Sequence, residues 1–206
     1  MPSEPPPPTV PAPAPPASPA LTRRSLLALA LALPGLGLGA DPAVAAPAAR
    51  ELALVHRHTG EAWRAVYFAD GRYRRGAVQE ASRILRDWRT GQAVPIDPRL
   101  LDILHALQQR LGGRGPLEVL CGYRSPRTNA MLRRKSRGVA RNSLHMRGMA
   151  VDLHFPADRL PAAHRLACAL GAGGVGYYPG AGFIHVDTGP VRHWQQGRRA
   201  GARRGA

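Results

Sequence analysis

From residue 51 onward, the sequence alternates short strand-like stretches with stretches of helical periodicity, and this alternation constrains the fold more than any other feature. Segment 51–76 predicts two strands around His58-Thr59-Gly60, because apolar and polar residues alternate on both sides of a turn-forming sequence. A further turn is expected at Asp70-Gly71, since both residue types tolerate the backbone of tight hairpin turns. The folded domain is therefore expected to begin with a β-hairpin.

Two core helices are expected after this hairpin. The first carries five apolar residues at helical spacing, which are Val78, Ala81, Ile84, Leu85 and Trp88. Gly91 is placed to end it. The second helix is marked more strongly, because Asp97 can cap its start, Pro98 suits its first position and Gly112 follows its end. Its apolar stripe consists of Leu100, Leu104, Leu107 and Leu111.

The remaining segments complete a mixed domain. Residues 117–121 and 149–155 predict strands, and Ser125-Pro126 predicts the start of a third helix between them. Residues 161–171 predict a fourth helix, and residues 173–189 predict a hairpin that turns at 179–182. A few strands with segregated helices indicate an α+β fold, in which helices flank an antiparallel sheet.

The first 45 residues lie outside this pattern. Residues 1–20 hold ten of the 21 prolines and no aromatic residue, so we expect a disordered extension there. Residues 21–45 combine a charged start, a short apolar run and Ala43-Val44-Ala45, which is the order of a secretory signal peptide. The apolar run is too short to cross a bilayer, so no stable membrane span is expected.

The route of export is left with two alternatives. Arg23-Arg24 before the apolar run is typical of a twin-arginine signal, but an ordinary signal peptide can also carry two arginines. In both cases we expect cleavage near Ala45 and an exported, periplasmic domain at residues 46–194. Residues 195–206 are expected to form a basic, disordered tail.

The formal net charge of +16 belongs entirely to the mature protein, because residues 1–45 contain two arginines and two acids. Such a charge attracts polyanions. The basic residues are scattered, however, and cluster only at Arg133-Arg134-Lys135 and in the tail, without a nucleic-acid-binding motif. We therefore expect no nucleic-acid partner and regard the anionic cell envelope as the polyanion.

Asp152 and His185 are candidate metal ligands. Side chains alternate along a strand, so each of these residues lies on the face opposite to the apolar residues of its own strand. If the two strands are neighbours, both side chains reach one patch, and His145 can fold over it because Gly148 allows the chain to bend. Two imidazoles and one carboxylate suit a catalytic zinc site with an open fourth position. The alternative is a loop histidine beside a hydrogen-bonded strand aspartate.

The sequence does not show whether the two cysteines form a disulfide. Cys121 and Cys168 could pair in an oxidising compartment. Two cysteines alone form no disulfide framework, and buried free cysteines are common, so both alternatives stay open.

Several motifs resemble a family of zinc peptidases. SLHMRGMAVD, at 143–152, is similar to the S-x-H-x-x-G-x-A-x-D motif of the D-Ala-D-Ala carboxypeptidase and dipeptidase clan. GYRSPRTNAMLRR, GGVGYYP and GFIHVDTGPVRHW resemble the exported branch of that clan, the murein endopeptidase K group. The likeness extends over about 52–194 and implies a D-Ala-D-Ala metallopeptidase-like fold with one zinc ion per chain. By this resemblance the metal ligands are His145, Asp152 and His185, while Ser143 binds substrate and Arg124 stabilises the developing oxyanion.

The general base is the weakest match to that family. Its base commonly lies two or three residues before the last ligand, where this chain has Phe183 and Gly182. Asp187 is on the same strand face as His185 and is the nearest catalytic substitute, although it could instead orient that imidazole. His154 and His193 are further alternatives. Cys121 stands where a serine is usual, and we expect only a change in packing.

The resemblance and the residues together predict a zinc-dependent murein endopeptidase that hydrolyses peptide cross-links during cell-wall remodelling. Its partners would be the peptide stems of peptidoglycan, and we expect a monomer. A non-catalytic peptidoglycan-binding domain is one alternative, because the usual base is missing, and a secreted polyanion binder is another. The sequence leaves open whether the cleaved bond joins D-alanine to diaminopimelate or joins two diaminopimelates.

Overall fold

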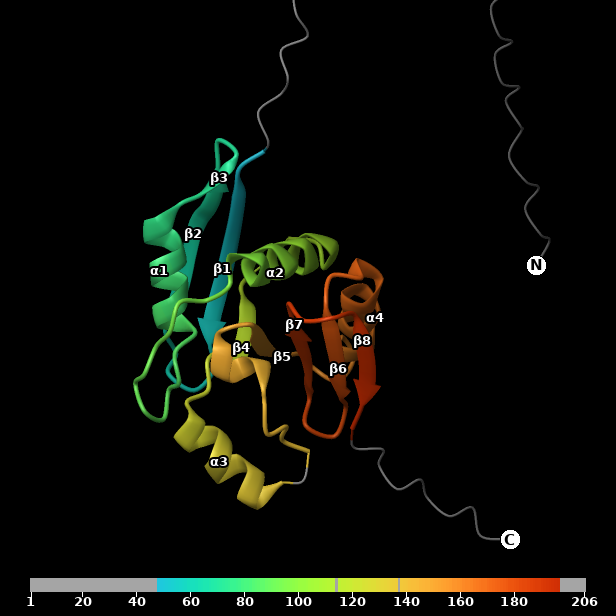
Figure 1. Cartoon of the computed structure of the whole chain (residues 1–206). Helices are drawn as coiled ribbons and strands as arrows, with labels where there is room; N and C mark the ends of the chain where they lie inside the picture. Colours follow the sequence, from blue (N-terminus) through green and yellow to red (C-terminus); the bar gives the residue numbers. More distant parts are fainter. Residues whose placement is uncertain (1–47, 114, 137, 197–206) are drawn as a thin grey trace, which may run out of the picture. The chain divides into compact units, whose positions relative to one another are not determined.

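The computed structural model describes residues 48–113, 115–136 and 138–196 (Figure 1). The proline-rich extension and the signal segment lie outside these residues, as does the tail after Gln196. Gln195, with which the expected tail begins, is the last residue of a strand. In the described part of the chain, no helix has the length and apolar character needed to span a bilayer.

One sheet of eight strands organises the described residues. Its strands are β1 (Arg50–His56), β2 (Ala62–Ala69), β3 (Arg72–Tyr73), β4 (Leu117–Cys121), β5 (Ala150–His154), β6 (Gly174–Tyr178), β7 (Phe183–Asp187) and β8 (Arg192–Gln195). Their spatial order is β3-β2-β1-β4-β5-β7-β6-β8. The pairs β1–β4 and β6–β8 are parallel and the other pairs are antiparallel, so the predicted α+β class with a mainly antiparallel sheet is confirmed.

Four helices and one short 3-10 helix accompany the sheet. They are α1 (Arg75–Ile84), α2 (Pro98–Arg110), α3 (Pro126–Lys135), η1 (Leu144–Arg147) and α4 (Leu160–Leu170). The start of α2 is as predicted, because the Asp97 carboxylate accepts a hydrogen bond from the Arg99 amide at 3.0 Å. Likewise Ser125 caps α3, and its hydroxyl accepts from the Thr128 amide at 3.2 Å.

The prediction that α1 continues to Trp88 was wrong. The helix ends at Ile84, and the chain then turns back on itself around Asp87. The backbone amide of Gly91 donates to the Asp87 carbonyl at 2.7 Å, and the Asp87 carboxylate accepts from the Ser125 amide at 2.9 Å. These bonds to a buried carboxylate compete with helix continuation, and helical periodicity alone does not report them.

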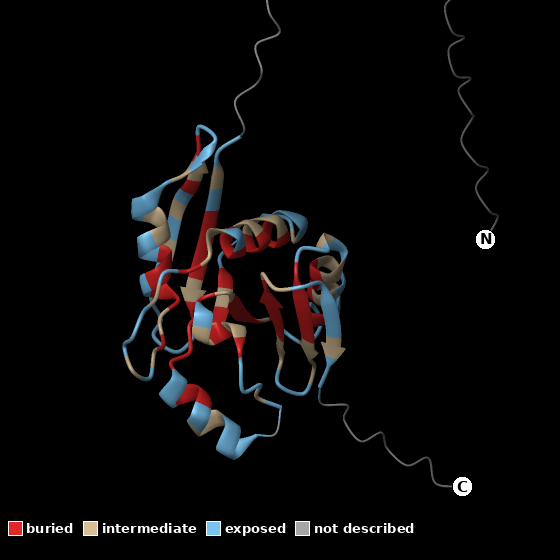
Figure 2. Ribbon diagram, viewed as in Figure 1, coloured by how far each residue is buried: buried red, intermediate tan, exposed pale blue. Residues whose placement is uncertain are grey.

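The hydrophobic core lies on one face of the sheet, under α2 and α4. Helices α2 and α4 contact each other, and α4 also packs on β6 and β7. Four residues of β5 and β7 are almost fully buried on this face, Val151, Leu153, Ile184 and Val186. Figure 2 shows the buried residues concentrated in the central strands and on α2. The opposite face of β5, β6 and β7 is therefore left to carry polar residues.

The register between β5 and β7 places the polar residues of this second face. Asp152 lies directly opposite His185, while Val151 pairs with Val186 and Leu153 with Ile184. Side chains on paired residues of an antiparallel sheet point to the same face. The predicted neighbourhood of the two strands is thus confirmed, and it brings Asp152 and His185 to one patch.

Asp97 joins the start of α2 to this part of the sheet. Its second carboxylate oxygen accepts from the Thr188 hydroxyl at 2.8 Å, directly after β7, and its own amide donates to the Gly148 carbonyl at 3.0 Å. Burial alone would raise the pKa of Asp97, but the hydrogen bonds from Arg99 and Thr188 outweigh burial and lower it. The ionised carboxylate is therefore stabilised by folding.

Replacing Asp97 by alanine should lower the free energy of unfolding by about 1–2 kcal/mol at neutral pH, because the helix cap is lost. Asp97→Asn should lose much less, since asparagine caps equally well. A group with a depressed pKa stabilises the fold above its unfolded pKa, so the deficit of Asp97→Ala should shrink below about pH 4. Urea unfolding from pH 7 to pH 3 measures this. A deficit that does not change with pH would contradict the role of the ionised form.

Candidate metal centre

Three side-chain atoms from three segments form a small triangle on the polar face of the sheet. The His145 Nε2 atom lies 3.2 Å from Asp152 Oδ1 and 3.1 Å from His185 Nδ1. The third side, from His185 Nδ1 to Asp152 Oδ1, measures 3.0 Å. All three residues are at most 8% exposed. The structure thus brings together the three ligands suggested by the sequence.

The triangle has the dimensions of one face of a metal coordination tetrahedron. Zinc binds histidine nitrogen and carboxylate oxygen at about 2.0–2.2 Å, which places tetrahedral ligand atoms about 3.3 Å apart. The observed distances of 3.0 to 3.2 Å are slightly shorter. The donor set and its spacing therefore fit a metal.

The outer nitrogens of both imidazoles are held by acceptors. His145 Nδ1 lies 2.7 Å from the carbonyl oxygen of Gly122, and His185 Nε2 lies 2.9 Å from Asp187 Oδ2. An N–H at each of these positions leaves the opposite nitrogen, inside the triangle, with a free lone pair. Metal-binding histidines are oriented in this way by carbonyl or carboxylate groups behind the ring.

The loop before β5 folds so that His145 reaches the strand residues. Ser143 precedes η1, and Gly148 ends it in the left-handed region with φ of 66°. A side chain at Gly148 would also be blocked, since a Cβ atom there would lie 2.6 Å from the Pro95 carbonyl oxygen. The bend that the sequence predicted at Gly148 is confirmed, and it turns His145 back over Asp152.

Electrostatics couple the members of the triangle. Burial opposes charge on His145, but the carboxylate of Asp152 and the thiol of Cys121 outweigh burial and raise the pKa of His145 to about 10. Burial alone would raise the pKa of Asp152, yet the two histidines hold it far below its usual range. Both shifts show that the surroundings of Asp152 favour positive charge, which a bound cation would supply.

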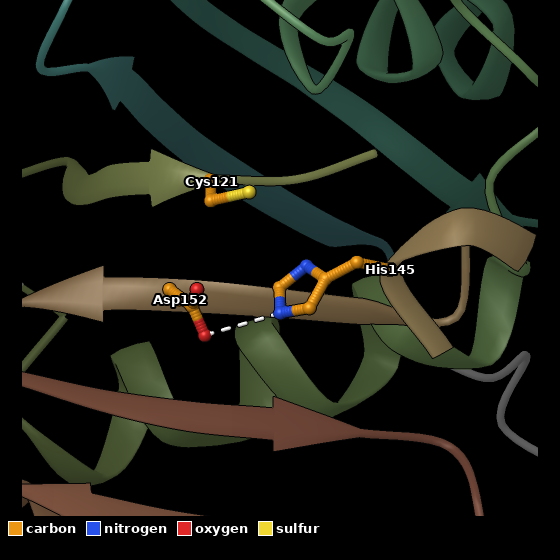
Figure 3. Close-up of side chains that lie close together, drawn as sticks. All are labelled: Cys121, His145 and Asp152. Carbon is orange, nitrogen blue, oxygen red and sulfur yellow. Dashed lines mark hydrogen bonds and ion pairs between the residues drawn. The ribbon is translucent and has the colours of Figure 1, made fainter. Parts of the chain in front are cut away.

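Cys121 lies closer to this centre than the sequence indicated. It pairs with Asp152 across β4 and β5, and its ligand atom lies within 4.8 Å of those of His145 and Asp152. Figure 3 shows the three side chains, with a dashed line from the Asp152 carboxylate to His145 and with Cys121 on the neighbouring strand β4. The set with His185 is the tighter one, at 3.0 to 3.2 Å, so Cys121 is the less favoured donor. Both cysteines are free thiols.

Asp187 lies behind the triangle rather than in the open space before it. Its side chain is fully buried, and Oδ2 accepts from Arg192 at 2.6 Å as well as contacting His185. Oδ1 accepts from the amides of Gly174 at 3.0 Å and Gly189 at 2.8 Å. Burial raises its pKa, but these partners, His185 first, lower it well below the usual range. With every oxygen occupied, the carboxylate is suited to orienting His185.

Arg124 and Ser143 flank the triangle. One Arg124 amino group lies 3.4 Å from Asp152 Oδ2, and the other donates to Asn129 at 3.3 Å. Its Nε atom is buried and has no partner among the described residues. Ser143 makes no side-chain cap bond to η1, so its hydroxyl is available to a bound molecule. Both residues line the same cleft as the three candidate ligands.

This cleft has a volume of about 510 Å³ and opens in front of the triangle. Besides Asp152, His145 and His185, its wall contains three aromatic residues, Tyr178, Phe183 and Trp194. Asp187, His154 and His193 are not among the residues that line it. Trp194 and Tyr178 were missed in the sequence, although the alternation in GGVGYYP places Gly176 and Tyr178 on the same strand face as His185.

Comparisons with known proteins extend over this whole region. Residues 44–194 match the family described as peptidoglycan L,D-endopeptidase MepK. The chain is 44% identical over 176 residues to the peptidoglycan L,D-endopeptidase MepK of Escherichia coli (strain K12), which is 84% of this chain and 96% of that protein. The MepK of Shigella flexneri matches equally well. A probable MepK of Haemophilus influenzae is 40% identical over 173 residues, covering 80% of this chain and 93% of that protein.

Proposed function

Because the chain belongs to the peptidoglycan L,D-endopeptidase MepK family, a family of metallopeptidases, we propose that it is a zinc-dependent enzyme that hydrolyses peptide cross-links of peptidoglycan. The observation that carries the proposal is the triangle of His145, Asp152 and His185, with sides of 3.0 to 3.2 Å at the base of a cleft. We assign one zinc ion per chain to these three ligands.

When bound, zinc supplies a Lewis acid that polarises the scissile carbonyl and lowers the pKa of a water molecule to about 7, so no side-chain base is needed to deprotonate it. This matches the composition of the cleft. Among the described residues that line it, the carboxylates and imidazoles are those of the three ligands. Gly182 and Phe183 stand where the family commonly has its general base, and the proposed reaction needs no other residue to replace that base.

The residues around the ligands have separate tasks. Arg124 presents a cationic guanidinium at the cleft, where it can stabilise negative charge on the carbonyl oxygen during water addition. Ser143 offers a hydroxyl to the backbone of the peptide. Asp187 holds His185 in orientation from behind and does not itself carry the proton, since its oxygens are fully engaged and it is absent from the cleft wall.

The name of the relatives supports a proposal for the bond that is cleaved. An L,D-endopeptidase cuts between centres of L and D configuration, so of the two cross-links left open by the sequence we propose the one between two diaminopimelates. The arginines at the cleft, Arg124 and Arg192, suit the carboxylates that these stems carry.

We propose further that the enzyme works in the periplasm and leaves the cytoplasm by the twin-arginine route. The support is the position of Arg23-Arg24 before a short apolar run, in a part of the chain outside the described residues. Peptidoglycan as substrate agrees with this location.

The mature protein should contain about one zinc per chain, and His185→Ala should lose most of that zinc and its activity on cross-linked muropeptides. Cys121→Ser is the matched control, because it removes the nearest competing donor while leaving the triangle intact. It should keep both zinc and activity. Elemental analysis and chromatography of the digests measure the two properties. Full activity in a folded His185→Ala protein would overturn the ligand assignment.

Asp187→Asn separates an orienting residue from a general base. The substitution keeps the shape but removes the charge behind His185, so zinc affinity should fall by about 10- to 100-fold. Saturating zinc should then restore most of kcat. The exposed Asp158→Asn serves as a control that should resemble the wild type. A fall in kcat of about 10² to 10⁴ at full zinc occupancy would instead identify Asp187 as the base.

Replacing Arg23 and Arg24 together by lysine should leave the precursor in the cytoplasm, since the twin-arginine pair is the recognised feature. Cell fractionation followed by immunoblotting of the precursor and mature forms measures this. Export at the wild-type level would show that the ordinary secretory route is used.

A further inference from the structure

Tyr178, at the end of β6, places a phenol hydroxyl on the wall of the cleft. The Trp194 indole Nε1 donates a hydrogen bond to this hydroxyl at 2.8 Å. An indole N–H is a donor only, so the hydroxyl oxygen accepts this bond and its own proton must point elsewhere. Among the described residues this hydroxyl makes no second hydrogen bond. The geometry therefore leaves a donor without a partner, beside the triangle of ligands.

The surrounding strands hold this hydroxyl in place. The Tyr178 ring stacks on Phe183, with ring centres 4.3 Å apart and an angle of 12°. The Trp194 ring lies directly over Gly176, where an added Cβ atom would come within 2.6 Å of it. Gly176 pairs with both His185 and Trp194 across the sheet, so Tyr178, two residues on, lies on the same face as the ligands.

The electrostatic environment keeps the phenol protonated. Burial raises the pKa of Tyr178, and the nearby charge of Asp152 adds to this effect. The hydrogen bond from Trp194 and the charge of Arg124 act in the opposite direction without cancelling it. At neutral pH Tyr178 is therefore a neutral hydrogen-bond donor, and the charges of Asp152 and Arg124 both act on it.

We propose that Tyr178 is a further catalytic residue, whose hydroxyl donates a hydrogen bond to the scissile carbonyl oxygen as that oxygen gains negative charge. The inference rests on the proposed peptidase function. As the water oxygen bonds to the carbonyl carbon, the C=O electron pair moves to the carbonyl oxygen, where Tyr178 and Arg124 both donate. When the C–N bond breaks, that pair restores the carbonyl, and the leaving amine takes up a proton from solvent, which replaces the proton that the attacking water released. Tyr178 keeps its own proton throughout.

Tyr177 provides a matched control in the same strand. It is the preceding residue, so it faces the opposite side of the sheet, where its ring stacks on His164 of α4 with centres 4.5 Å apart. Tyr177→Phe removes the same atom from a tyrosine that does not line the cleft. Any general effect of losing a hydroxyl from β6 should appear in both variants.

Tyr178→Phe should lower kcat on diaminopimelate-linked muropeptide dimers by about 10- to 100-fold, with KM changed less than about threefold. Zinc content and thermal stability should equal those of the wild type. A phosphinate analogue of the dimer, which imitates the charged tetrahedral species, should bind more weakly by a factor similar to the loss in kcat. Trp194→Phe should show a smaller loss, because the hydroxyl stays but is no longer oriented. Tyr177→Phe should match the wild type.

Three outcomes would overturn the inference while leaving the peptidase function intact. One is a Tyr178→Phe enzyme with wild-type kcat and wild-type phosphinate affinity. Another is a rise in KM alone, which would make Tyr178 a binding surface. The third is a loss of zinc or of stability that accounts for the loss in rate. Failure of the zinc-loaded wild type to cleave the dimers would instead refute the proposed function itself.

Discussion

The register of β5 against β7 puts Asp152 directly opposite His185, and the rest of the polar face depends on that pairing. If β5 slipped by one residue against β7, Asp152 would point into the core and an apolar neighbour would face the cleft in its place. The slip is prevented by the opposite face, where Val151, Leu153, Ile184 and Val186 are buried under α2 and α4. The hydrophobic core therefore determines the geometry of the polar centre.

The buried polar centre is stable because side chains in successive rows on the polar face of the sheet pair with one another. The row of Asp152 and His185 provides the triangle, and the next row places Asp187 beside Gly174 and Arg192. Each buried carboxylate then has partners, because unpaired charges at such depth would cost several kcal/mol. Glycine at 174 and 176 is needed because side chains there would collide with Arg192 and Trp194.

Much of this arrangement could be predicted from the sequence where one local signal was sufficient. The cap and leucine stripe fixed α2, and strand alternation placed Asp152 and His185 on faces opposite to their apolar neighbours. Local sequence patterns did not predict the features that depend on tertiary contacts. The end of α1 depends on buried Asp87 contacting Ser125, and β8 is a short strand whose pairing with β6 brings Trp194 to Tyr178. The closeness of Cys121 to the centre likewise follows from pairing between β4 and β5, which its local sequence does not report.

We assign the metal to two imidazoles and one carboxylate, with the Cys121 thiol nearby but not bound. X-ray absorption spectroscopy of the zinc-loaded protein in solution tests this directly, because zinc–sulfur and zinc–nitrogen distances are distinct. We expect a shell of nitrogen and oxygen ligands only, at about 2.0–2.2 Å. A sulfur ligand at about 2.3 Å would place Cys121 on the metal and contradict the assignment of His145, Asp152 and His185 as the complete set of protein ligands.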